Sequence, residues 1–134
     1  MNNQSELLQF ALDISKEAGK IQQSYFGNIS SVSTKSNNID LLTIADTESE
    51  NLIISKIKET YPTHSIISEE TNNIINDSQY TWIIDPIDGT TNFIHNLPIF
   101  AVSIALKKID KIVCGVVYNP AADKCFYAES GKGA

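Results

Sequence analysis

Three short apolar segments in the last third of the chain, separated by two polar turns, constrain the fold most strongly. The segments cover residues 99–106, 111–118 and 124–128, and the turns are residues 107–110 and 119–123. Apolar runs of this length between turn-forming residues are typical of β-strands. Because parallel strands need a much longer crossover connection, strands joined by such short turns pair in opposite directions. The pattern predicts an antiparallel meander.

The first half of the chain contains two segments with helical periodicity. In residues 7–26 apolar side chains recur at steps of three and four, as they do on one face of a helix, and a glycine ends the pattern. A second amphipathic helix is expected from about residue 46 to residue 60, where a proline follows. Between the helices, residues 30–33 have a short strand-like pattern and residues 35–38 are polar enough to form a loop.

Two further strands are expected in the middle of the chain, and acidic residues follow both. They are residues 64–68, followed by Glu69 and Glu70, and residues 81–84, followed by Asp85. Carboxylates at such positions would lie where strands emerge from the core. Together with the helices and the meander, this predicts one α+β domain in which two helices pack on a mostly antiparallel sheet.

Composition narrows the class of partner and the cellular compartment. A formal net charge of −6 disfavours a nucleic-acid backbone or an anionic membrane surface as the partner. Cys114 and Cys125 are too far apart in sequence for a CxxC unit and have no neighbouring histidine ligands, so they indicate buried thiols in a reducing compartment, with a disulfide between adjacent strands as the alternative. The first six residues are polar, and no run approaches the roughly 20 apolar residues that span a bilayer. We therefore expect a soluble cytoplasmic protein.

The run DPIDGTTNFIH, residues 85–95, combines groups that bind cations with groups that bind phosphate. Asp85 and Asp88 flank an X-Pro turn and offer the oxygen ligands that magnesium prefers. Gly89 permits close approach of the backbone, and the two threonines that follow add hydroxyl and N–H groups for phosphate oxygens. Taken alone, the same run is also compatible with an ordinary surface turn.

Together with DLLTIAD at residues 40–46 and SEE at residues 68–70, this run resembles the inositol monophosphatase family. The similarity continues through GVVYNP at residues 115–120 and the terminal GKGA, and it covers nearly all of the chain after the first helix. The resemblance implies the amino-terminal part of the layered sugar-phosphatase fold. It also implies Mg²⁺-dependent hydrolysis of a phosphate monoester by metal-activated water, without a covalent phosphoenzyme.

The resemblance assigns roles to individual residues. The metal ligands that it implies are Glu69, Asp85, Ile87 through its carbonyl group, and Asp88. The residues that it implies for phosphate binding are Gly89, Thr90 and Thr91. Glu70 is an alternative to Glu69, because local spacing does not separate two adjacent acids.

By the same resemblance, Thr90 and Asp46 form a hydroxyl–carboxylate pair that acts with Glu69 on the attacking water, supported by Asp40 and Thr43. On spacing alone, Asp46 or Thr43 is equally suited to cap the second helix. Other polar residues near these motifs are interpreted as structural or exposed: His64, His95 and Lys35.

The resemblance also indicates what is absent from these 134 residues. Family members are longer, and their second half supplies another metal-ligand aspartate in a Trp-Asp motif; Trp82, the only tryptophan, precedes Asp85 instead. Residues 1–134 are therefore expected to be the amino-terminal part of a longer domain, which would form a homodimer. The expected substrate is a small phosphorylated sugar or polyol such as inositol monophosphate. Alternatives are a fructose-bisphosphate or NADP phosphatase of the same superfamily, or a non-catalytic cation-binding fragment.

Overall fold

The computed structural model describes residues 3–29, 35–68 and 73–133. In these residues the elements follow one another as α1 (Asn3–Phe26), α2 (Lys35–Thr60), β1 (Ser65–Ser68), β2 (Tyr80–Asp88), α3 (Thr90–Ile94), β3 (Ala101–Lys108), β4 (Lys111–Asn119) and β5 (Lys124–Glu129). The sheet has the order β1-β2-β3-β4-β5. Only β1 and β2 pair in parallel, and the other three pairs are antiparallel.

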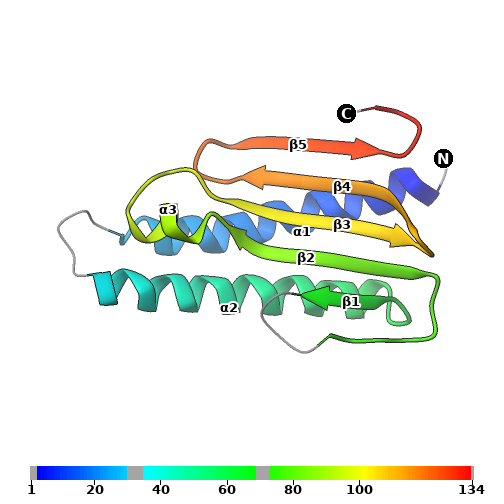
Figure 1. Ribbon diagram of the computed structural model, residues 1–134, viewed down its shortest axis with the longest axis horizontal. Coiled ribbons are helices and arrows are strands. Elements are labelled where there is room, and N and C mark those ends of the chain that lie inside the picture. The colour runs from blue at the N-terminus through cyan, green and yellow to red at the C-terminus, as the bar shows by residue number, and fades with distance from the viewer. Residues whose placement is uncertain (1–2, 30–34, 69–72, 134) are drawn as a thin grey trace.

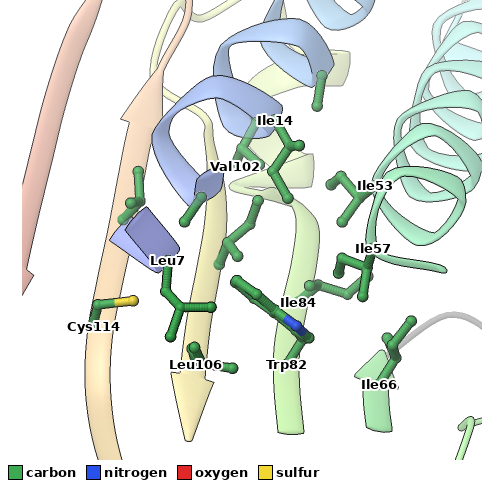
Figure 2. Packing of buried hydrophobic residues seen from close by; sticks show 14 of the residues in the cluster. Leu7, Ile14, Ile53, Ile57, Ile66, Trp82, Ile84, Val102, Leu106 and Cys114 are labelled. Carbon is green, nitrogen blue, oxygen red and sulfur yellow. The ribbon is translucent and has the colours of Figure 1, made fainter. Parts of the chain in front are cut away.

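The long helices α1 and α2 lie together on one face of this sheet (Figure 1). Between them and the sheet is a core to which both helices and every strand from β1 to β4 contribute buried side chains. Figure 2 shows Ile14 of α1 and Ile53 and Ile57 of α2 around Trp82 and Ile84 of β2. The predicted α+β fold with two helices on a mostly antiparallel sheet is confirmed, and so is the meander formed by β3, β4 and β5.

The prediction that residues 35–38 form a loop before a helix starting near residue 46 was wrong. Helix α2 begins at Lys35, and the buried side chain of its first turn is polar: Asn38 is 4% exposed, and its Nδ2 donates to the carbonyl oxygen of Ile94 in α3. Ala45 is fully buried in a second cluster with Ile87, Phe93 and Phe100. These partners come from much later in the chain, so helical periodicity within the segment alone did not indicate them.

Thr43 and Asp46 consequently lie inside α2 and cannot cap its start. The Thr43 hydroxyl donates to the carbonyl of Ile39, one turn earlier, which is the usual bond of a threonine within a helix. The strand-like pattern at residues 30–33 lies outside the described residues.

Two further boundaries differ from expectation and both affect the candidate site. Strand β2 continues through Asp85 to Asp88, because its partner β3 pairs with both aspartates. After Gly89 the chain forms the short helix α3, which the sequence did not predict.

Among the described residues, no helix combines the length and the apolar character needed to cross a membrane.

Candidate metal- and phosphate-binding site

A β-bulge in β2 places Asp85 and Asp88 on the same face of the sheet. Asp85 pairs with Ser103 of β3 and Asp88 pairs with Ala101, so three residue steps on β2 correspond to two on β3. Ser103 and Ala101 are two residues apart and share one face, and directly opposed residues share that face too. Asp88 is exposed and Asp85 is partly exposed. Both carboxylates are therefore accessible from one side.

The two residues inside the bulge are buried and anchor it. Pro86 is buried, and the Ile87 side chain, 3% exposed, packs in the cluster with Phe93 and Phe100. This anchoring fixes the chain directly before the Ile87–Asp88 peptide group, whose carbonyl, that of Ile87, is the predicted metal ligand. Its role as a ligand stays a prediction.

Gly89 connects β2 to α3 in a conformation that favours glycine. Its φ of 91° lies in the left-handed region. A Cβ atom at this position would lie 2.9 Å from the carbonyl oxygen of Ile99 and 3.2 Å from the Cα of Phe100. The close approach that the sequence suggested at Gly89 is thus made to the protein's own backbone. Whether Gly89, Thr90 and Thr91 bind phosphate stays a prediction.

Asp46 and Thr90 line the same cavity, although they are far apart in sequence. The cavity has a volume of about 350 Å³, and its wall comes from α2 and from the start of α3. Thr43 also lines it, whereas Asp85 and Asp88 do not. The shared wall is compatible with the hydroxyl–carboxylate pair that was predicted for Thr90 and Asp46, whose catalytic role stays a prediction.

Glu50 is a polar residue of this cavity that the sequence did not single out. It lies one helical turn after Asp46, and it is 1% exposed. Its carboxylate accepts a hydrogen bond from the hydroxyl of Ser68, at the end of β1. In the sequence, the four-residue step from Asp46 to Glu50 was the available sign that the two side chains share a helix face. Many pairs of residues in a helix have this spacing, so it did not single out Glu50.

The two glutamates of the SEE motif, Glu69 and Glu70, lie outside the described residues. Strand β1 ends at Ser68, which pairs with Ile84, the residue before Asp85. Among the described residues, no three His, Cys, Asp or Glu side chains are grouped closely enough to hold a metal ion. The carboxylates of Asp85 and Asp88 are oxygen donors of the kind that suits Mg²⁺, and they fit part of a magnesium site.

The two histidines near the motifs occupy structural or exposed positions. His64 stacks on Tyr61 at 4.7 Å between ring centroids, and its Nδ1 accepts a hydrogen bond of 3.0 Å from Trp82 Nε1. Burial lowers the pKa of His64, so the neutral form that accepts this bond is favoured. His95 is exposed at the end of α3. Lys35 is the first residue of α2.

Comparison with known proteins identifies the family. The model of the inositol monophosphatase family matches residues 3–134. The chain is 43% identical over 134 residues to inositol monophosphatase 1 of Homo sapiens, covering 96% of this chain and 48% of that protein. It is 35% identical to the fructose-1,6-bisphosphatase/inositol-1-monophosphatase of Thermotoga maritima, covering 95% of this chain and 49% of that protein.

Solved structures agree with this match. The crystal structure of extragenic suppressor protein SuhB from Bartonella henselae superimposes with a TM-score of 0.85 at 37% identity, covering 96% of this chain and 50% of that one. The chain spans about half the length of the curated relatives it matches. Because the sequence match covers residues 3–134 and the fold match covers nearly the same residues, the chain belongs to the inositol monophosphatase family.

Proposed function

We propose that this chain forms the carboxylate and phosphate-binding part of a Mg²⁺-dependent phosphomonoesterase. The observation that carries the proposal is the bulge in β2, which brings Asp85 and Asp88 to one face of the sheet in a chain of the inositol monophosphatase family. A pair of aligned carboxylates has an evident use in holding a hard cation next to a phosphate group.

In the proposed mechanism, Asp85, Asp88, Glu69 and the carbonyl of Ile87 would hold the metal ions, and Gly89, Thr90 and Thr91 would bind the phosphate group. Bound Mg²⁺ would neutralise phosphate charge and lower the pKa of a coordinated water. The Thr90 hydroxyl would donate to the Asp46 carboxylate, and this pair, with Glu69, would orient the water and accept its proton. Their shared cavity wall supports the Thr90–Asp46 part of this assignment.

The proposed substrate is a small phosphorylated polyol such as inositol monophosphate. The names of the human and Thermotoga maritima relatives support this choice. A fructose-bisphosphatase is the second candidate, because the Thermotoga maritima relative carries both activities in its name. An NADP phosphatase belongs to the same superfamily and stays a further alternative.

We further propose a cytoplasmic location and, for any longer product of the gene, a homodimer. Two free cysteines, Cys114 and Cys125, support a reducing compartment. The net charge of −6 supports a small phosphorylated molecule rather than a nucleic acid as the partner.

The test is phosphate release with and without Mg²⁺ from inositol 1-phosphate, fructose 1,6-bisphosphate and NADP. It compares the 134-residue chain with any longer product of the same gene. We expect Mg²⁺-dependent release from inositol 1-phosphate by the longer product and little by the 134 residues alone, which correspond to about half of each relative. No release from any substrate by either protein would favour the non-catalytic cation-binding fragment.

A further inference from the structure

A fully buried glutamine in α1 contacts the bulge that carries the two aspartates. Gln22 is 0% exposed, and its Nε2 donates to the carbonyl oxygen of Pro86 at 2.6 Å. The same Nε2 donates to the hydroxyl of Ser49 in α2 at 3.2 Å. Gln22 therefore joins both long helices to the middle of the bulge.

The acceptor is a backbone group that the sheet does not pair. In the register of β2 with β3, Asp85 and Asp88 have partners, whereas Pro86 and Ile87 between them do not. A buried carbonyl without a donor costs free energy, and Gln22 removes that cost for Pro86. Within the described part of the chain, the Oε1 atom of Gln22 is itself buried without a hydrogen-bond partner. An apolar side chain would avoid that cost, so the donor at Pro86 is the feature that accounts for a glutamine here.

The adjacent residue of α2 makes a second contact of the same kind. Ser49 binds Gln22, and Glu50, the next residue, accepts a hydrogen bond from Ser68 at the end of β1. All four of these side chains are buried. One helix thus connects the β2 bulge, which contains Asp85 and Asp88, to the end of β1.

We propose that Gln22 is a positioning residue for the candidate metal site. It holds the Pro86–Ile87 segment in the conformation that aligns Asp85 with Asp88, while Ser49 and Glu50 connect that segment to β1. The inference rests on the proposed function, since it assigns Gln22 to the same metal site. Hydrogen-bonded neighbours of metal ligands commonly set metal affinity in this way, without contacting the ion.

The test replaces Gln22 with methionine, which has a similar length but no donor for the Pro86 carbonyl. Gln23→Met makes the same change at the next position of α1, where the side chain is exposed. Ile57→Val weakens the core between α2 and the sheet without touching the bulge. For each variant of the 134-residue chain, Mn²⁺ affinity is measured by electron paramagnetic resonance, stability by urea unfolding, and amide exchange at Ile87 and Asp88 by NMR.

In Gln22→Met we expect the Kd for Mn²⁺ to rise at least about tenfold and amide exchange at Ile87 and Asp88 to accelerate. Gln23→Met and Ile57→Val should bind Mn²⁺ as the unmodified chain does, although Ile57→Val is less stable. If Gln22 has only a structural role, Gln22→Met will instead lose stability and keep its Mn²⁺ affinity, as Ile57→Val does. If Gln22→Met does not unfold cooperatively, Gln22→Asn replaces it, because its shorter amide cannot reach both Pro86 and Ser49.

Asp88→Asn separates the two ways in which the inference can fail. If Asp88→Asn weakens Mn²⁺ binding and Gln22→Met does not, the positioning role is rejected and the metal site stands. If Asp88→Asn binds Mn²⁺ as tightly as the unmodified chain, or if the unmodified chain binds none, the proposed metal site is rejected and the role of Gln22 with it.

Discussion

Asp85 and Asp88 are three residues apart, and in a regular strand residues with that spacing point to opposite faces. The extra residue of the bulge changes this relation, so that the two carboxylates share a face. At the scale of single residues, the chemistry proposed for this chain depends on that one-residue irregularity. Bulges next to functional sites commonly redirect a side chain in this manner.

Asp85→Asn and Asp88→Asn should each abolish Mg²⁺-dependent hydrolysis in the longest product of the gene. An amide removes the charge that holds the cation, and even changes in outer-shell partners commonly cost about 10–100-fold. The fold should persist, because Asp88 is exposed and Asp85 is partly exposed. Phosphate release and circular dichroism measure the two effects. Asp110→Asn, at an exposed turn beyond the other end of β3, is the matched control. Full activity in both site variants would refute the assignment.

Gly89→Ala should destabilise the fold by about 3 kcal/mol, from the left-handed backbone and the contact with Ile99 together. The added Cβ would lie 2.9 Å from a backbone carbonyl oxygen that cannot move easily. Gly131→Ala is the control, because Gly131 also has a positive φ but open space around it. That control should lose only about 1 kcal/mol. Equal losses in urea unfolding would show that the contact with Ile99 has no cost.

At the scale of elements, an aromatic stack joins the end of α2 to β1 and β2. The His64 ring lies between Tyr61 and Tyr80, at 4.7 and 4.8 Å between centroids, and its Nδ1 accepts the Trp82 N–H. This arrangement needs neutral His64, because a protonated Nδ1 cannot accept a hydrogen bond. Burial accordingly lowers the pKa of His64 below its ordinary value of 6.5.

This stack should make stability depend on pH. A His64 with a lowered pKa in the folded state leaves the unfolded chain as the better proton binder, so its contribution is intact above about pH 6.5 and is lost as the pH falls from there toward the folded-state pKa. Urea unfolding at about pH 7.5 and about pH 5.5 measures the loss. His64→Gln should lose less stability between these pH values than the unmodified chain. His95→Gln, at the exposed histidine, should behave as the unmodified chain does. Identical pH dependence in His64→Gln would exclude His64 as the source.

At the scale of the whole molecule, α1 and α2 cover one face of the sheet and leave the other open (Figure 1). Paired positions on the open face include Val117 of β4 and Phe126 of β5, which are 43% and 67% exposed. They lie in the same row across the sheet as Ser103 and Asp85. Asp85 thus borders an apolar surface.

The 134-residue chain should therefore associate at high concentration, because exposed apolar area favours contact between copies. Sedimentation velocity over a concentration series measures this association. The double variant Val117→Thr, Phe126→Thr should lower it. Ile75→Thr, which changes a 72% exposed isoleucine before β2, should not. Equal association of all three proteins would indicate that another surface is involved, such as the edge of β1 or β5.

Several parts of this structure followed from local patterns. The periodicity of residues 7–26 indicated α1, and the spacing of apolar runs and turns indicated β3, β4 and β5. The motifs at residues 40–46, 68–70 and 85–95 together indicated the family. These features were readable because the residues that cause them are neighbours in sequence.

The sequence by itself determined where helical and strand periodicity occurs and which acidic motif the chain carries. Only the tertiary structure decided the first turns of α2, which contact residues far along the chain: Asn38 donates to the carbonyl oxygen of Ile94, and Ala45 is buried in a cluster with Phe93 and Phe100. The bulge that aligns Asp85 with Asp88 likewise requires the register of β3. The contact of Gln22 with Pro86 spans 64 positions of the chain. Such features depend on which distant residues meet, and a local pattern contains no information about distant partners.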